Sequence, residues 1–84
     1  MKPKPEVVMI GLGYIGLPTA ALISSQHTFV HGVDINQNVV DTINKGQIHI
    51  VEPDLENVVS NAVQNGYLFA SRLPVEAHIS IIVV

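Results

Sequence analysis

Residues 7–21 read VVMIGLGYIGLPTAA and combine an apolar run, three glycines and the beginning of a helix. Residues 7–10 are all apolar, which predicts a buried strand of a parallel sheet with helices on both of its faces. Gly11, Gly13 and Gly16 follow at the spacing G-x-G-x-x-G. The stretch therefore predicts a strand, a tight turn and a helix.

The three glycines stand where side chains would obstruct such a turn. We expect Gly11 to permit the turn off the strand, Gly13 to let a pyrophosphate approach the backbone, and Gly16 to let the helix pack closely on the strand. Free N–H groups and the positive end of the helix dipole would then hold the phosphate charge without a lysine. Pro18 suits the first helical turn, where a proline loses no hydrogen bond.

An acidic residue about 20 positions after the glycines distinguishes a dinucleotide site from a turn that serves packing alone. Residues 28–33 predict a second strand, and Asp34 follows it, 18 residues after Gly16. A carboxylate there accepts hydrogen bonds from the adenosine ribose hydroxyls and repels a 2′-phosphate. Residues 35–38 contain no arginine that could pair with such a phosphate. The pattern favours NAD over NADP; the alternatives are a packing turn and a turn or helix-capping aspartate.

Length and composition limit the class of protein. The 84 residues make at most one small domain, and their charged fraction of 13% lies well below the typical quarter. The net charge is −3 with only four basic residues, which argues against a nucleic-acid partner. No uninterrupted apolar run reaches 18 residues, so we expect no membrane span and a cytoplasmic protein. The absence of cysteine leaves no disulfide, zinc–thiolate site or thiol nucleophile in this chain.

Hydrophobic spacing predicts the remaining helices. Residues 15–25 predict the first, and the side chains available for burial on it are Leu17, Ala20, Ala21 and Leu22. Asn36 is a candidate N-cap for a second helix, which we expect Gly46 to end. We expect Glu52-Pro53-Asp54 to open a third helix, which carries an amphipathic stripe over residues 55–63 and ends at Asn65 and Gly66.

The remaining segments predict strands and ends. Residues 67–70 and 79–84 predict two further strands, with a single helical turn over 74–77 between them. We interpret residues 1–6 as a disordered lead-in. Because the chain stops within an apolar strand, we expect residues 7–84 to be the N-terminal portion of a domain whose sheet is truncated after about four strands.

No residue pattern of the chain predicts a metal or catalytic centre. His27 and His31 are four apart, but the residues between them favour a strand, where that spacing does not give the helical metal-binding face. Glu52, Asp54 and Glu56 are better interpreted as acids of a first helical turn than as paired catalytic carboxylates.

Three stretches, VMIGLGYIGLPTA, GVDIN and INKGQIHIVEPDL, resemble the N-terminal part of the UDP-glucose/GDP-mannose dehydrogenase family. The resemblance implies an α/β fold of Rossmann type, and a full-length homo-oligomeric enzyme that oxidises the C6 alcohol of a nucleotide sugar to a carboxylate in two NAD-dependent steps. It also implies that Gly11, Gly13 and Gly16 form the phosphate turn, that Tyr14 and Ile15 contact the cofactor, and that Asp34 holds the ribose.

The family's catalytic cysteine and lysine, its central and C-terminal domains and most of its sugar-binding residues lie beyond residue 84. The resemblance therefore implies no catalytic residue in this chain and leaves the sugar open. Two alternatives remain: another NAD-dependent dehydrogenase with a similar N-terminal half, which the E-P-D-L stretch disfavours, and a non-catalytic nucleotide-binding module or fragment.

Overall fold

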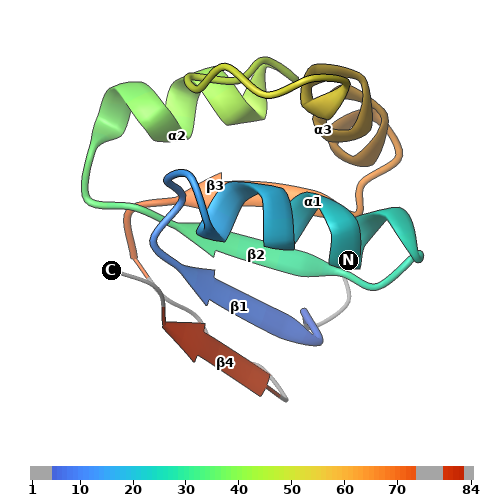
Figure 1. Ribbon diagram of the computed structural model, residues 1–84. Helices are drawn as coiled ribbons and strands as arrows, with labels where there is room; N and C mark the ends of the chain where they lie inside the picture. Colours follow the sequence, from blue (N-terminus) through green and yellow to red (C-terminus); the bar gives the residue numbers. More distant parts are fainter. Residues whose placement is uncertain (1–4, 74–78, 83–84) are drawn as a thin grey trace.

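The computed structural model describes residues 5–73 and 79–82. The elements in chain order are β1 (Val7–Ile10), α1 (Gly16–Ser25), β2 (Val30–Val33), α2 (Gln37–Asn44), α3 (Leu55–Gln64), β3 (Leu68–Ser71) and β4 (Ile79–Ile82). The strands form one sheet in the order β3-β2-β1-β4, and every pair is parallel. Figure 1 shows the three helices together on one face of the sheet. The predicted α/β fold of Rossmann type is confirmed.

The sheet grows in two directions from β1. Val7 of β1 lies opposite Val30 of β2 and opposite Ile79 of β4. The chain thus builds β2 and β3 on one side of β1 and returns to place β4 on the other. In open α/β sheets, ligands bind beyond the carboxyl ends of the strands where the strand order reverses in this way. The segment that follows β1 occupies this position.

A single apolar core lies between the sheet and the helices. Its buried members come from all three helices and from β1, β2 and β3, so the layers are joined by side chains distant in sequence. The buried core residues are Val7, Met9, Leu12, Leu17, Ala20, Ala21, Val30, Val40, Ile43, Ile50, Leu55, Val59, Ala62, Leu68 and Ala70.

The buried face of α1 corrects one sequence expectation. Leu17, Ala20 and Ala21 are buried as predicted, but the side chain of Leu22 is 65% exposed. The buried positions recur at i, i+3, i+4 and i+7, and Leu22 points away from that stripe because each residue turns the helix by about 100°. Ser24 takes the i+7 position, and its hydroxyl donates to the Ala21 carbonyl at 3.0 Å. That bond lets a polar side chain be buried without losing a partner.

The ends of the helices follow the predicted signals. The Asn36 side chain accepts a hydrogen bond from the Asn38 N–H at 2.9 Å, which confirms it as the N-cap of α2. Gly46 and Gly66 lie just past α2 and α3. Glu56 lies in the first turn of α3, whereas Glu52 and Asp54 precede that helix.

Some expectations differ from the structure or lie outside it. The described helices cover one face of β1 rather than both. The second strand begins at Val30, two residues later than expected, and the Phe29 carbonyl just before it accepts hydrogen bonds from the Glu6 and Val7 N–H groups. The helical turn expected over 74–77, and residues 1–4 of the lead-in, lie outside the described residues.

Candidate functional site

Gly11 and Gly16 bring the end of β1 into contact with the start of α1. Gly11 has φ of 102°, a conformation that favours glycine, and its N–H donates to the Val33 carbonyl at 2.8 Å. A Cβ added to Gly16 would lie 1.7 Å from the Gly11 carbonyl oxygen. The helix can approach the strand this closely only because residue 16 has no side chain, as the sequence predicts.

Gly13 lies on the solvent-exposed side of the same turn. A Cβ at this position would have no atom within 4 Å, so the protein itself does not require a glycine there. The N–H groups of Gly13, Tyr14 and Ile15 donate no hydrogen bond to any residue within 5–73 or 79–82. The first turn of α1 carries no acidic residue and has no side-chain cap. The turn therefore offers free donors and a positive helix end to an anion.

Asp34 joins this turn to the end of β2. Its Oδ2 accepts a hydrogen bond from the Leu12 N–H at 3.1 Å, and its Oδ1 accepts one from the Asn36 N–H at 2.9 Å. The bond to Asn36 is the local turn interaction that the sequence leaves open as an alternative. A carboxylate oxygen can accept more than one hydrogen bond, so each oxygen of Asp34 can still accept another, for example from a ribose hydroxyl. The carboxylate is thus held in place beside the glycine turn.

The two other predicted contact residues lie at the helix start. Tyr14 is 73% exposed and Ile15 is 66% exposed. Ile15 is the residue that precedes α1, and its carbonyl accepts hydrogen bonds from the backbone N–H and the hydroxyl of Thr19. Both side chains are available to a ligand on the turn, and neither is part of the buried core.

Two residues that sequence reasoning did not assign lie at the same edge of the sheet. Ile35 follows Asp34 and is 85% exposed, and Arg72 follows Ser71, whose carbonyl accepts the Asp34 N–H at 3.1 Å. Arg72 lies outside residues 35–38, the segment next to Asp34 in the sequence, and the adjacency of β2 and β3 that brings it close is not visible in the sequence. The fold therefore brings an arginine to the strand end beside Asp34.

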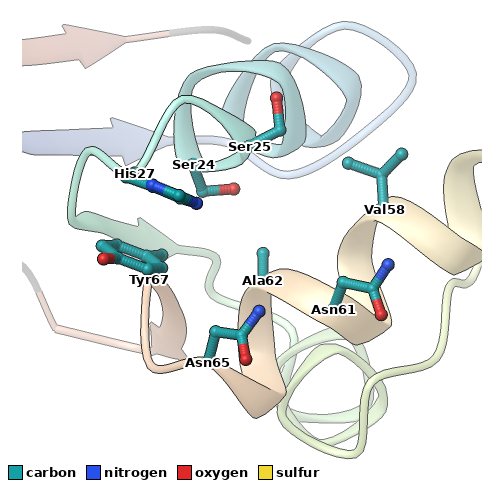
Figure 2. A pocket seen from close by; sticks show the side chains of 8 residues that line it. All are labelled: Ser24, Ser25, His27, Val58, Asn61, Ala62, Asn65 and Tyr67. Atoms are coloured by element: carbon teal, nitrogen blue, oxygen red, sulfur yellow. The ribbon is translucent and has the colours of Figure 1, made fainter.

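A hollow lies at the amino-terminal ends of β2 and β3, away from the glycine turn. It has a volume of about 210 Å³ and lies between the C-terminal ends of α1 and α3. Figure 2 shows its lining side chains, which are Ser24, Ser25, His27, Val58, Asn61, Ala62, Asn65 and Tyr67. His27 and Tyr67, whose rings stack with centroids 4.9 Å apart, come just before β2 and β3. This hollow is therefore separate from the glycine turn, which follows the carboxyl end of β1.

The two histidines singled out in the sequence have structural partners. The His31 ring lies in β2 with its Nε2 at 2.6 Å from the Ser71 hydroxyl oxygen, and His27 stacks on Tyr67. No group of three His, Cys, Asp or Glu side chains able to hold a metal occurs in the described part of the chain. Across the same residues, no helix combines the length and apolar character needed to cross a bilayer.

Comparison with known proteins identifies the family. Residues 5–84 match the NAD binding domain of the UDP-glucose/GDP-mannose dehydrogenase family. The chain belongs to this family. The matching model is the NAD binding domain of that family, which confirms the predicted family and cofactor.

Individual family members agree with this assignment. UDP-N-acetyl-D-mannosamine dehydrogenase of Escherichia coli K12 is 65% identical over 71 residues, which are 84% of the chain and 17% of that enzyme. The Campylobacter jejuni enzyme of the same name is 61% identical over 79 residues, covering 94% of the chain and 19% of the relative. The crystal structure of UDP-N-acetyl-mannosamine dehydrogenase from Staphylococcus aureus superposes with a TM-score of 0.91 at 40% identity, covering 94% of the chain and 19% of that protein. The chain thus spans about a fifth of the length of these relatives.

Proposed function

We propose that the glycine turn and Asp34 hold NAD for a nucleotide-sugar 6-dehydrogenase that acts on UDP-N-acetyl-D-mannosamine. The observation that supports the site is the hydrogen bond between the Leu12 N–H and Asp34. It brings a ribose-binding carboxylate and a set of free phosphate-binding N–H groups into one unit. The sugar is proposed because relatives that are 61–65% identical to the chain are UDP-N-acetyl-D-mannosamine dehydrogenases.

The residues present fit the cofactor. The open position above Gly13 leaves room for a pyrophosphate against the backbone, and the free N–H groups of Gly13, Tyr14 and Ile15 are donors of the required kind. Asp34 accepts hydrogen bonds from the ribose hydroxyls while the Leu12 and Asn36 N–H groups hold it in position. Tyr14 and Ile15 pack beside the bound phosphates.

The contribution of this chain to catalysis is orientation. When bound, NAD accepts the hydride that the alcohol and then the aldehyde release during the oxidation. Asp34 and the turn would hold one end of the cofactor at the carboxyl ends of the strands, which would limit the orientations open to the rest of it. We propose that the complete enzyme is a cytoplasmic homo-oligomer with no nucleic-acid or membrane partner; its family membership and the chain's net charge of −3 with four basic residues support this.

Cofactor binding is tested by calorimetric titration of the 84-residue chain with NAD and with NADP. Gly13→Ala and Asp34→Ala are the variants, and circular dichroism monitors folding. We expect binding of NAD that is stronger than that of NADP and is weakened in both variants. Equal binding of NAD by the folded wild type and both folded variants would refute the assignment of these residues.

Sugar oxidation is tested with a chimera in which this chain replaces the matching N-terminal segment of the Escherichia coli enzyme. We expect NADH formation with UDP-N-acetyl-D-mannosamine, and its loss in the Gly13→Ala chimera. A folded chimera that binds NAD but forms no NADH with UDP-N-acetyl-D-mannosamine would contradict the proposal that this segment orients NAD for that oxidation, while leaving the cofactor site intact.

A further inference from the structure

The side chain of Asn44 makes a paired contact with the backbone of β3. Its Nδ2 donates to the Ala70 carbonyl at 2.8 Å, and its Oδ1 accepts from the Ala70 N–H at 2.8 Å. A side-chain amide carries the same donor and acceptor as a peptide group. The two bonds therefore satisfy Ala70 in the way that a residue of a neighbouring strand would.

The backbone N–H and carbonyl groups of Ala70 point away from the neighbouring strand β2. The strand order places β3 at one edge, with β2 as its neighbour. The carbonyls of Tyr67 and Ser71 accept hydrogen bonds from the N–H groups of Val30 and Asp34, so the odd-numbered residues of this segment point their backbone groups toward β2. Backbone groups alternate in direction along a strand, so those of Ala70 point outward. Asn44 therefore occupies the middle of the free edge.

We propose that Asn44 closes the outer edge of β3 and thereby keeps two copies of the chain from pairing through this strand. An unpaired edge is a template for another strand, and proteins commonly block it with charged residues, prolines or a covering helix. Residues 68–71, LFAS, contain neither a charge nor a proline. Asn44 is the last residue of α2, so the helix reaches over the edge and supplies the blocking group.

The occupant that this edge would accept is a second β3. Two identical edge strands can pair antiparallel about a two-fold axis, and each then satisfies the outward groups of the other. Phe69 is 44% exposed and adds apolar surface to the same strand. Removal of Asn44 frees both the donor and the acceptor of Ala70 for such a pair.

A purely structural role for Asn44 makes a different prediction. If its bonds only anchor α2 to the sheet, their loss lowers stability without promoting association. Asn36 is a matched control, because it is an asparagine at the other end of α2 whose side chain accepts one backbone hydrogen bond, from Asn38 of the same helix. Asn36→Ala and Asn44→Ala both weaken the helix, but only Asn44→Ala opens the edge.

The test is sedimentation velocity of wild type, Asn44→Ala, Asn44→Asp and Asn36→Ala over a wide range of concentration, with amide exchange of Ala70 as a second readout. We expect Asn44→Ala to self-associate at least about tenfold more tightly than wild type or Asn36→Ala, and its Ala70 amide to exchange faster in the monomer. Asn44→Asp keeps an acceptor for the Ala70 N–H and adds a charge, so it should remain as monomeric as Asn36→Ala.

Three results would overturn the proposal. The first is an Asn44→Ala variant that is no more associated than Asn36→Ala. The second is equal association of Asn44→Asp and Asn44→Ala, because association would then follow lost stability rather than the open edge. The third is failure of Asn44→Ala to fold while Asn36→Ala folds, because Asn44 would then be an anchor of the fold.

Discussion

Gly13 and Gly16 belong to one motif, but an added methyl group should lower the stability of the fold at Gly16 and weaken cofactor binding at Gly13. The Cβ of Gly16→Ala would lie 1.7 Å from the Gly11 carbonyl oxygen, where real Cβ contacts are essentially never closer than 3.0 Å, so the turn and α1 must separate by more than 1 Å. Overpacking of this kind costs about 1–3 kcal/mol or more. At roughly 4–8 °C per kcal/mol in a domain of this size, we expect Tm to fall by about 4 °C or more.

Gly13→Ala should leave the fold intact and weaken only cofactor binding. The new Cβ meets no atom within 4 Å, so the free energy of unfolding should change by no more than about 0.5 kcal/mol. A pyrophosphate against the backbone would be displaced by the methyl group and lose at least one hydrogen bond to a charged group, worth about 1.5–3 kcal/mol. This corresponds to roughly a 10- to 150-fold rise in Kd for NAD.

The two variants are compared by thermal unfolding monitored by circular dichroism and by calorimetric titration with NAD. An unchanged Kd in Gly13→Ala would show that the phosphates do not approach residue 13. A Tm of Gly16→Ala equal to that of wild type would show that the close approach of α1 to the Gly11 carbonyl does not exist. Either result would refute the division of roles between the two glycines.

Four further substitutions test the remaining parts of the fold and site. Asp34→Asn supplies only one acceptor oxygen, so one of the two backbone N–H groups that bond to Asp34 loses its partner. We expect the free energy of unfolding, measured in urea, to fall by about 1–3 kcal/mol. We also expect NAD binding, measured by titration, to weaken. Leu17→Ala should destabilise the fold by about 2–5 kcal/mol in urea unfolding, whereas Leu22→Ser, on the exposed side of the same helix, should change it by less than about 0.5 kcal/mol. Asn36→Ala should lower stability by about 0.5–2 kcal/mol, and an unchanged midpoint would argue against its capping role.

Local signals in the sequence were sufficient to predict the order and type of the elements. The apolar run of β1, the N-cap Asn36 and the glycines after α2 and α3 each act within a few residues of the feature that they specify. The glycine turn was predictable for the same reason, because strand, turn and helix are continuous in the chain. The burial of Ser24 in place of Leu22 was also accessible in principle, since it follows from helical periodicity alone.

Contacts between distant segments were not predictable from the same signals. The bond between Leu12 and Asp34 joins residues 22 apart, and the pair formed by Asn44 and Ala70 joins residues 26 apart. Each depends on strand order and register, which a single sequence does not reveal. The position of Arg72 beside Asp34 depends on the pairing of β2 with β3. The sequence could thus propose residues for the site but could not show the hydrogen bonds that hold them together.

The hydrogen bond between Leu12 and Asp34 affects how the preference for NAD over NADP could be changed. If Asp34 contacted only the ribose, its replacement by a small neutral residue would make room for a 2′-phosphate next to Arg72 and would hardly lower the stability of the protein. The same carboxylate, however, is the acceptor for the Leu12 N–H within the glycine turn. Its loss leaves a partly buried backbone donor of the glycine turn unsatisfied, a cost of about 1–3 kcal/mol. A change of preference toward NADP therefore requires both a cation for the 2′-phosphate and a new acceptor for Leu12.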